Sequence, residues 1–342
     1  MMRRRRLVLG LSTLGAAALL AAVLARMLLP GIQPESLVLA VSRSALGPPF
    51  WIAERKGYFA AEGLDLELVI HPTGKAAFAA MLAGEADVAT VAETPLVFAS
   101  LAGTRFQIIA SFTSNTEYSL ITRAAPGLDE VSDLRGRRIG VDLGTAAHYF
   151  LHVMLSDAGL STSDIEWVPI PGREQAEALR AARVDAIAAF APYSTQCRLA
   201  LGEEALSFPA GIRYRGYGTL VTRPGFSTDR AEAVRRLLRA TDHALDWMRA
   251  HPEQALLLAA EAAELDVELL RETWDAMRPN LGLDHGLVAL LETEARWAIA
   301  ERLVPGATSD TALPDYLDLI DPSVLAALHP ESVTIIGKPT RP

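Results

Sequence analysis

Short turns rich in hydroxyl groups and glycine are the first candidates for chemistry in this chain. These residues are Ser42, Ser44, Thr73, Gly144, Thr145 and Ala146. Each turn precedes a stretch with helical periodicity, and a helix N-terminus presents free amide groups that can bind an anion. Glycine lets the backbone approach a ligand closely, although Gly-Thr before a helix is also typical of a plain helix cap. Neither a Gly-x-Gly-x-x-Gly motif nor a Walker sequence is present, so the pattern does not support nucleotide binding.

One acidic residue, Glu93, lies in a comparable turn, Glu93-Thr94-Pro95. A carboxylate beside a bound anion would repel it, and an unpaired charge costs several kcal/mol when it is desolvated. Two interpretations therefore stay open. Either a cation of the protein pairs with Glu93, or the ligand carries an amine or a ring N–H.

Metal binding and catalysis have little support in the sequence. His148 and His152 are four residues apart and share one helix face, but neither a third ligand nor an adjacent glutamate accompanies them. The single cysteine, Cys197, excludes an internal disulfide and any cysteine-based zinc or iron–sulfur site, and we expect it to be a small buried hydrophobe. No Ser-His-Asp array or paired-acid motif is legible. We expect no metal, no cofactor and no catalytic residue.

A repeat positions these turns. The segments 41–95 and 141–192 share the order strand, helix, strand, helix, strand, with Phe50 and Phe150 at matching places and an acid, Asp87 or Asp185, opening the last strand. Strands that alternate with helices of ten to fifteen residues build parallel sheets through right-handed crossovers. The fold class is therefore α/β, with one small lobe for each copy.

Two such lobes create a cleft, and ligands of open α/β sheets bind outside the carboxyl ends of the strands. The turns expected there are 42–49, 73–76 and 93–95 of the first copy and 144–148, 172–174 and 190–193 of the second. Aromatic residues should shape the pocket. The full set of expected ligand-binding residues is Ser42, Ser44, Phe50, Trp51, Thr73, Glu93, Thr94, Asn115, Gly144, Thr145, Ala146, His148, Phe190, Tyr193 and Tyr217.

Four motifs carry a family resemblance. KGYFAAEGLDLEL (56–68), AGEADVA (83–89), DLRGRRIGV (133–141) and GTAAH (144–148) resemble signatures of the substrate-binding proteins of ABC transporters for nitrate, sulfonates, taurine and thiamine precursors. The resemblance runs in register over about 35–255. It implies a type II periplasmic-binding-protein fold with a two-strand hinge and a ligand between the lobes. The chain departs from the pattern at Ala191, where the family often has an acid, and at Glu93, where sulfonate binders tend to carry small hydroxyl residues.

The resemblance also implies a function. It predicts an extracytoplasmic solute-binding component of an ABC importer, not an enzyme, which captures a small polar ligand of the sulfonate, nitrate, aromatic-acid or pyrimidine type. As a monomer it would dock permease and ATPase subunits. The alternatives are a membrane-tethered sensor or accessory binding protein and, less favoured, a pyrimidine-synthase-like enzyme on the same fold.

The remaining organisation follows from composition. Residues 1–32 read as a signal or an N-terminal membrane anchor, because a basic start precedes 19 uncharged apolar residues, Leu7–Ala25. This places the rest in the periplasm or on the outer face of the cytoplasmic membrane. The net charge is −9, and removing the five arginines of 1–30 leaves −9 − 5 = −14, which argues against nucleic acid as a partner.

We expect residues 33–120 and 219–342 to form the first lobe and 121–218 to form the second. The segments 118–122 and 214–222 are the hinge candidates. Helices are expected over 229–249, 253–264, 267–277 and 284–302, and a short one over 314–320 should return to the first lobe.

Overall fold

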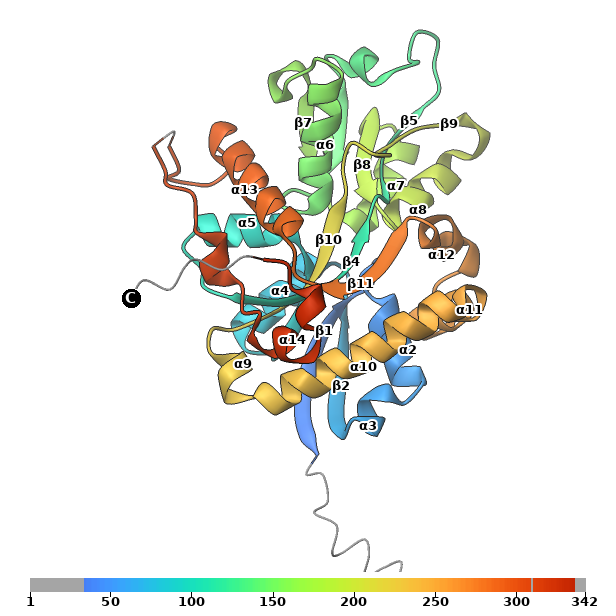
Figure 1. Ribbon diagram of the computed structural model, residues 1–342. Helices are drawn as coiled ribbons and strands as arrows, with labels where there is room; N and C mark the ends of the chain where they lie inside the picture. The colour runs from blue at the N-terminus through green and yellow to red at the C-terminus, as the bar shows by residue number, and fades with distance from the viewer. Residues whose placement is uncertain (1–33, 309, 336–342) are drawn as a thin grey trace, which may run out of the picture. The chain divides into compact units, whose positions relative to one another are not determined.

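The computed structural model describes residues 34–308 and 310–335, so the predicted signal or anchor segment, 1–32, lies outside the described residues. The chain forms two sheets (Figure 1). The first has the order β11-β4-β10-β3-β1-β2, and the second has the order β7-β6-β8-β5-β9. The strands are β1 (Glu35–Ser42), β2 (Leu64–His71), β3 (Val88–Ala92), β4 (Gln107–Asn115), β5 (Tyr118–Arg123), β6 (Arg138–Val141), β7 (Glu166–Pro169), β8 (Ala186–Phe190), β9 (Ala205–Pro209), β10 (Gly216–Thr222) and β11 (Met277–Gly282).

The predicted repeat and the α/β fold class are confirmed. In the first copy β1 pairs with β3 in parallel, and in the second copy β6 pairs in parallel with β7 and β8. The helices between them are α2 (Pro48–Arg55), α3 (Tyr58–Ala61) and α4 (Gly74–Ala83) in the first copy, and α6 (Ala146–Asp157) and α7 (Gly172–Arg180) in the second. After each copy comes one further helix, α5 (Glu93–Leu101) or α8 (Tyr193–Leu201).

The acid that opens the last strand of the first copy ties three strands together. The Asp87 carboxylate accepts a hydrogen bond from the Val38 amide of β1 at 3.0 Å, and the Asp87 amide donates to the Val38 carbonyl at 2.9 Å. The Asp87 carbonyl accepts from the Thr222 hydroxyl of β10 at 2.8 Å. A strand end that would otherwise leave backbone groups unpaired is thereby satisfied.

Asp185 repeats this arrangement in the second copy. Its carboxylate accepts from the Arg138 amide of β6 at 2.9 Å, and its amide donates to the Arg138 carbonyl at 2.8 Å. The Thr122 hydroxyl of β5 donates to the Asp185 carbonyl at 2.7 Å. The same local chemistry therefore anchors the third strand of both lobes.

The chain crosses between the sheets twice. β4 belongs to the first sheet and β5 to the second, and later β9 belongs to the second and β10 to the first. The strand pairings move the expected lobe boundaries, because Tyr118 already pairs with Phe190 in the second sheet and Gly216 with Asn115 in the first. The crossings therefore lie at 116–117 and 210–215.

Two strands, β9 and β11, were not predicted, and β11 replaces part of an expected helix. The helix expected over 267–277 ends at Trp274, and Met277–Gly282 instead pairs antiparallel with β4. Pro279 cannot donate to a ladder, but β11 forms the edge of the sheet, where proline is tolerated. The other later helices are α9 (Phe226–Asp229), α10 (Ala231–Ala250), α11 (Pro252–Ala263), α12 (Val267–Trp274), α13 (His285–Ala300) and α14 (Ser323–Leu328).

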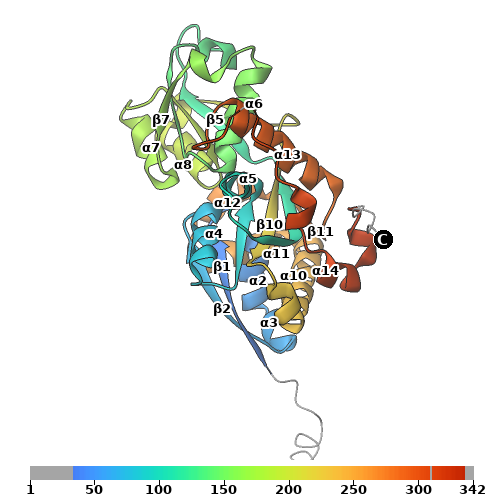
Figure 2. The same ribbon diagram turned by 90° about the vertical axis from the view of Figure 1, so that its left-hand side faces the viewer.

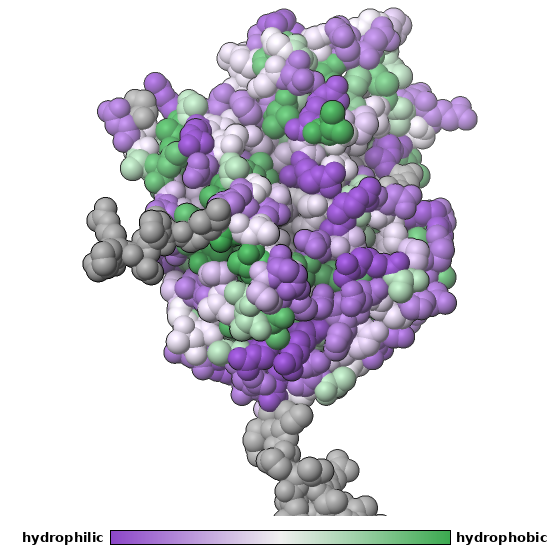
Figure 3. All heavy atoms as spheres, viewed as in Figure 1, coloured by the Kyte–Doolittle hydropathy of each residue, from purple (hydrophilic) through white to green (hydrophobic). Residues whose placement is uncertain are grey.

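The C-terminal segment returns to the first lobe as expected. Tyr316–Leu319 is a short 3₁₀ helix, the Tyr316 hydroxyl lies 3.1 Å from that of Ser100, and Ile320 bridges to Ile108. Within the described part of the chain, no helix combines the length and the apolar composition needed to cross a bilayer. On the face shown in Figure 3 hydrophilic residues prevail, and the hydrophobic ones form separate small patches.

The matched acids give the first prediction. We expect Asp87→Ala and Asp185→Ala each to lower the free energy of unfolding by about 1–3 kcal/mol, because each leaves a strand amide unpaired. Urea denaturation followed by circular dichroism measures this. Asp65→Ala, at an exposed position of β2, is the control and should change stability little. A clear effect of only one of the two substitutions would contradict the equivalence of the copies.

Candidate functional site

The first lobe presents hydroxyl groups where β1 ends. Ser42 and Ser44 are buried, and their hydroxyl oxygens lie 2.8 Å apart. The Ser42 amide donates to the Thr90 hydroxyl at 2.9 Å, and the Leu46 amide donates to that of Ser44 at 3.3 Å. The turn into α2 is therefore held by side-chain oxygens rather than by a regular ladder.

The N-terminus of α4 lies against β3. Thr73 caps this helix, because its hydroxyl accepts from the Ala76 amide at 3.2 Å. Gly74 follows, and a Cβ there would lie 3.1 Å from the Cα of Val91 and 3.2 Å from the Thr90 carbonyl. The absence of a side chain at Gly74 lets the start of α4 approach the strand end this closely.

The second lobe contributes the turn before α6. Gly144 has a φ of 73°, in the left-handed region that favours glycine. The Thr145 hydroxyl donates back to the Asp142 carbonyl at 2.7 Å and does not cap the helix. The prediction that the Thr145 side chain caps the helix is therefore wrong. The same hydrogen bond occupies the hydroxyl proton, so this proton is not available to a bound anion. The first amides of α6, which begins at Ala146, have no partner within the helix and offer that function instead.

Tyr193 connects the second lobe to the first. A Cβ at Gly172 would lie 2.5 Å from the Tyr193 ring, so glycine is what makes room for the tyrosine at the start of α7. The ring also packs edge to face on Phe190, with centroids 5.5 Å apart. Its hydroxyl donates to the Pro72 carbonyl of the first lobe at 3.0 Å.

The lobes close around a small cavity of about 40 Å³, called the polar cavity below because hydroxyl groups and one ammonium group are among its lining groups. Besides Tyr193, a second side chain spans the lobes, because the Lys75 ammonium donates to the Leu143 carbonyl at 2.7 Å. Expected site residues that line the cavity are Ser44, Thr73, Thr145, Ala146 and Phe190, and further lining residues are Leu46, Gly74, Lys75, Ala92 and Pro95. The structure therefore brings the hydroxyl turns of both copies to one place.

Lys75 is the charged residue that lines this cavity, and further charged residues lie near Asp142 and Tyr193. Asp142 is partly buried, which raises the pKa of its carboxyl, whereas Lys75, the Gly172 amide and Arg173 lower it. Burial and Asp142 raise the pKa of Tyr193, and Arg43 and Arg173 oppose this. Lys75 and Arg173 thus act on Asp142 and Arg43 acts on Tyr193, although Arg173 also pairs with Glu174 and the chain as a whole is acidic.

No cation is paired with Glu93 among the residues that the structure describes. It is fully buried, accepts hydrogen bonds from the Tyr214 hydroxyl and, at 2.9 Å, from the Tyr217 amide, and lies beside the carboxyl of Glu294 on α13. The expectation of a protein cation beside Glu93 is therefore wrong. Its oxygens face the return crossing and α13, and it is not among the residues that line the polar cavity.

Burial shapes the titration of this carboxyl pair. Desolvation is the main cause that raises the pKa of Glu93, and the pKa of Glu294 is raised well above its usual value by desolvation and by the negative charge of Glu93. Two adjacent buried carboxyls cannot both be ionised at low cost. We infer that Glu294 holds the proton and Glu93 the charge, because Glu93 has the hydrogen-bond donors.

Several other expected site residues lie away from the polar cavity. Thr94 is fully buried beside Glu294, Asn115 accepts from the Glu117 amide at the first crossing, and the Tyr217 hydroxyl donates to Asp284 at 3.1 Å. Phe50 packs edge to face on Phe112 in the core, with centroids 4.9 Å apart, and Trp51 packs beneath Gly47. These side chains pack in the protein interior or at the crossings and do not line the polar cavity.

His148 is buried among aromatic rings. Its centroid lies 4.9 Å from that of Trp297, 5.0 Å from that of Trp167 and 6.1 Å from that of Phe98. Burial lowers its pKa to about 4, so the imidazole is neutral. Together with Gly144 it lines a second, larger cavity that also contacts Lys75. Within residues 34–308 and 310–335 no group of three potential metal ligands occurs.

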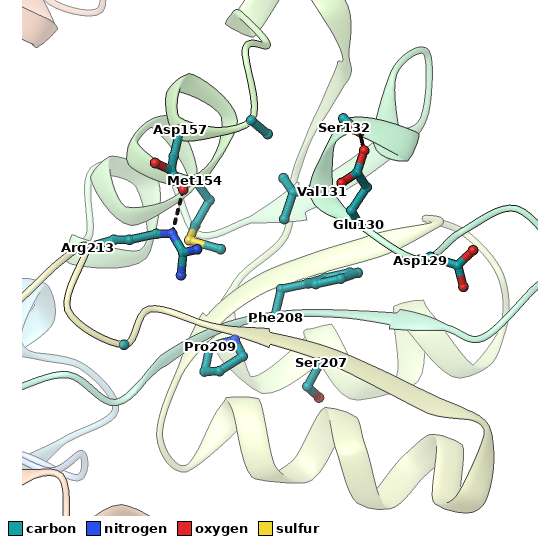
Figure 4. A pocket seen from close by; sticks show the side chains of 12 residues that line it. Asp129, Glu130, Val131, Ser132, Met154, Asp157, Ser207, Phe208, Pro209 and Arg213 are labelled. Atoms are coloured by element: carbon teal, nitrogen blue, oxygen red, sulfur yellow. Dashed lines mark hydrogen bonds and ion pairs between the residues drawn. The ribbon is translucent and has the colours of Figure 1, made fainter.

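A third cavity, of about 530 Å³, lies in the second lobe (Figure 4). Asp129 and Glu130 line it, and its arginine, Arg213, forms an ion pair with Asp157. This cavity is distant in the fold from the carboxyl ends of β1 and β6, where the hydroxyl turns meet. Its acidic rim and its paired cation make it a poor anion site.

Sequence reasoning missed Lys75 and Asp142 as site residues. Both signals were present, since Lys75 lies in the first turn of the helix that Thr73 caps, and Asp142 directly follows β6. The partners of Glu93 had no local signal, because Tyr214 and Glu294 are far away in the sequence.

The carboxyl pair makes stability depend on pH. The folded protein keeps a proton on Glu294 that the unfolded chain releases above about pH 4.5, so the free energy of unfolding falls as pH rises through the raised pKa. The side chain of Glu294→Gln cannot ionise. Between about pH 5 and pH 8 we therefore expect the free energy of unfolding of this variant to rise by at least about 1 kcal/mol relative to that of the unsubstituted protein. Thermal unfolding across this range measures the difference, with the exposed Glu261→Gln as control. Parallel pH profiles would show that no proton is held.

Known proteins resemble most of this chain in sequence or in fold. An aliphatic sulfonates-binding protein of Bacillus subtilis is 26% identical over 243 residues, which cover 68% of this chain and 71% of that protein. Among solved structures, the alkanesulfonate-binding protein SsuA of Xanthomonas axonopodis, bound to MOPS, has a TM-score of 0.73 at 19% identity and covers 86% of this chain and 100% of its own.

An enzyme shares the same fold. The desulfurization enzyme DszB has a TM-score of 0.65 at 19% identity, over 87% of this chain and 99% of its own. These structural likenesses confirm the periplasmic-binding-protein fold that the motifs implied. The family model described as NMT1/THI5 like matches residues 48–255, more than half of the sequence, and the chain therefore belongs to the NMT1/THI5-like family.

Proposed function

We propose that the protein is the extracytoplasmic solute-binding component of an ABC importer and that it captures a small organic anion of the sulfonate or carboxylate type. The observation that carries this proposal is the polar cavity where the start of α6 and the capped start of α4 meet from opposite lobes. Free amides at helix N-termini are well suited to an anion.

The charge around the cavity supports an anionic ligand. Arg43, Lys75 and Arg173 act on Asp142 or Tyr193 beside the cleft, and they outnumber the two nearby carboxylates, Asp142 and Glu174, the second of which pairs with Arg173. In a chain of net charge −9, cations gathered at one cleft attract and orient a negative solute. The sulfonates-binding relative fits this ligand class, and the closed complex would be delivered to permease and ATPase subunits outside the cytoplasm.

Binding of a solute requires no catalytic group. The chemistry of Cys197 argues against an enzyme that would use this cysteine as its nucleophile. This cysteine is fully buried in α8, as the sequence predicted, and burial raises its pKa to about 12. A thiol in such a site stays protonated at neutral pH and is a poor nucleophile. A cysteine-dependent reaction in this fold is therefore not supported for this chain.

A thermal-shift screen tests the proposal. Taurine, alkanesulfonates, aromatic acids, nitrate and aminopyrimidines should be compared, and an anion at 100 times its dissociation constant should stabilise the protein by about 2.7 kcal/mol. Stabilisation by aminopyrimidines alone, or by none of these solutes, would contradict an organic-anion receptor.

Lys75→Met provides the site-specific test. Removing the ammonium while keeping most of the apolar stem should weaken binding of the best anion by about 10- to 100-fold, because hydrogen bonds to charged groups contribute about 1.5–3 kcal/mol. Isothermal titration calorimetry measures the affinity. Lys56→Met is the matched control, since Lys56 lies over the Trp247 ring and away from the cleft. Equal affinity of Lys75→Met and Lys56→Met for the anion would show that Lys75 does not contribute to binding.

A further inference from the structure

A second cavity lies beside the polar one and is much larger. Its volume is about 530 Å³, and Lys75 and Pro95 line both cavities. Its walls come from α4, α5, α6 and β7, which lie together on the side of the molecule that faces the viewer in Figure 2. The two lobes both contribute, since Phe78 and Phe98 belong to the first and Leu143 and Trp167 to the second.

The sizes of the two cavities suggest different roles. A space of about 40 Å³ holds little more than one water molecule, which is enough only for the acid group of a solute. A space of about 530 Å³ is within the range of small-molecule pockets. The remainder of a ligand bound at the helix N-termini therefore has room beyond Lys75.

The walls of the large cavity favour an aromatic occupant. Phe78, Phe98 and Trp167 contribute rings, and the carbon stem of Lys75 passes between the two spaces. The Lys75 ammonium donates one hydrogen bond to the Leu143 carbonyl, which leaves two N–H groups for an acid group. Apolar walls next to a cation match a ligand with an aromatic body and one negative end.

His148 also lines this cavity, packed among the rings of Phe98, Trp167 and Trp297. Its Nδ1 accepts from the Gly144 amide at 3.3 Å, so the proton is on Nε2. This Nε2 is buried and has no hydrogen-bond partner among the residues that the structure describes. The residue is 3% exposed and its Nε2 is enclosed by protein, so His148 contributes ring surface to the wall and not a donor for the solute.

We propose that this large cavity holds the aromatic body of the solute, whose acid group lies between Lys75 and the N-termini of α4 and α6. The inference rests on the proposed function and narrows its ligand class to aromatic acids. Because both lobes supply the walls, the aromatic body fills space that exists only when the lobes are closed. Closure and recognition of the ring are thus one event.

Calorimetric titration of the full chain with three sulfonates tests this. Methanesulfonate, benzenesulfonate and 2-naphthalenesulfonate share the acid group and differ in the apolar body. We expect affinity to increase at least tenfold from the first to the last. Quenching of tryptophan fluorescence by the aromatic ligands should accompany binding and should decrease in Trp167→Phe.

A variant that fills the large cavity separates the contribution of the aromatic ring to the affinity from that of the acid group. Ala79 is exposed on α4 and lines the large cavity, so Ala79→Phe should occupy it without disturbing the core. We expect this variant to lose the gain from the naphthalene ring and to keep its affinity for methanesulfonate within about twofold. Ala289→Phe, at an exposed position in α13 outside both cavities, is the matched control and should keep the gain.

The outcomes distinguish this inference from the proposed function. If methanesulfonate binds but the rings add no affinity, or if their gain survives in Ala79→Phe, the cavity is not used and the anion receptor stands. If none of the three sulfonates binds, this inference is overturned, and if no organic anion of the thermal-shift screen stabilises the protein either, the proposed function is overturned as well.

Discussion

The buried carboxyl of Glu93 holds the crossing between the lobes in place. It begins α5 and binds the Tyr214 hydroxyl of the return crossing and the Tyr217 amide of β10. The Tyr214 ring packs on Tyr118 of the first crossing, with centroids 4.7 Å apart. Both crossings are thereby tied to the helix whose first turn, through Pro95, lines the two neighbouring cavities.

The fold was largely predictable because its signals are local. The order of strands and helices in both copies follows from hydrophobic periodicity, and the acids Asp87 and Asp185 marked equivalent strand starts. β11 was missed because Met277–Gly282 contains proline, asparagine and glycine, which read as loop or helix end. Only the free edge of the sheet, a tertiary feature, makes that segment a strand.

The site was predictable in part for the same reason. Turns at strand ends are placed by topology, so Ser44, Thr73 and Thr145 meet at one cavity. Side-chain partners are not placed by topology. The Thr145 hydroxyl binds the carbonyl three residues before it, and Glu93 meets a tyrosine and a glutamate that no local pattern connects to it.

Both side chains that span the cleft end on backbone carbonyls, those of Leu143 and Pro72. Hydrogen bonds of this kind contribute about 1 kcal/mol each, so the two add a factor of about thirty to the contribution of the other contacts between the lobes, such as that of Phe98 with His148. Because every residue has a backbone carbonyl, substitutions at positions 72 and 143 keep these two acceptors. Substitution of Lys75 or Tyr193 removes the donor and with it the hydrogen bond between the lobes.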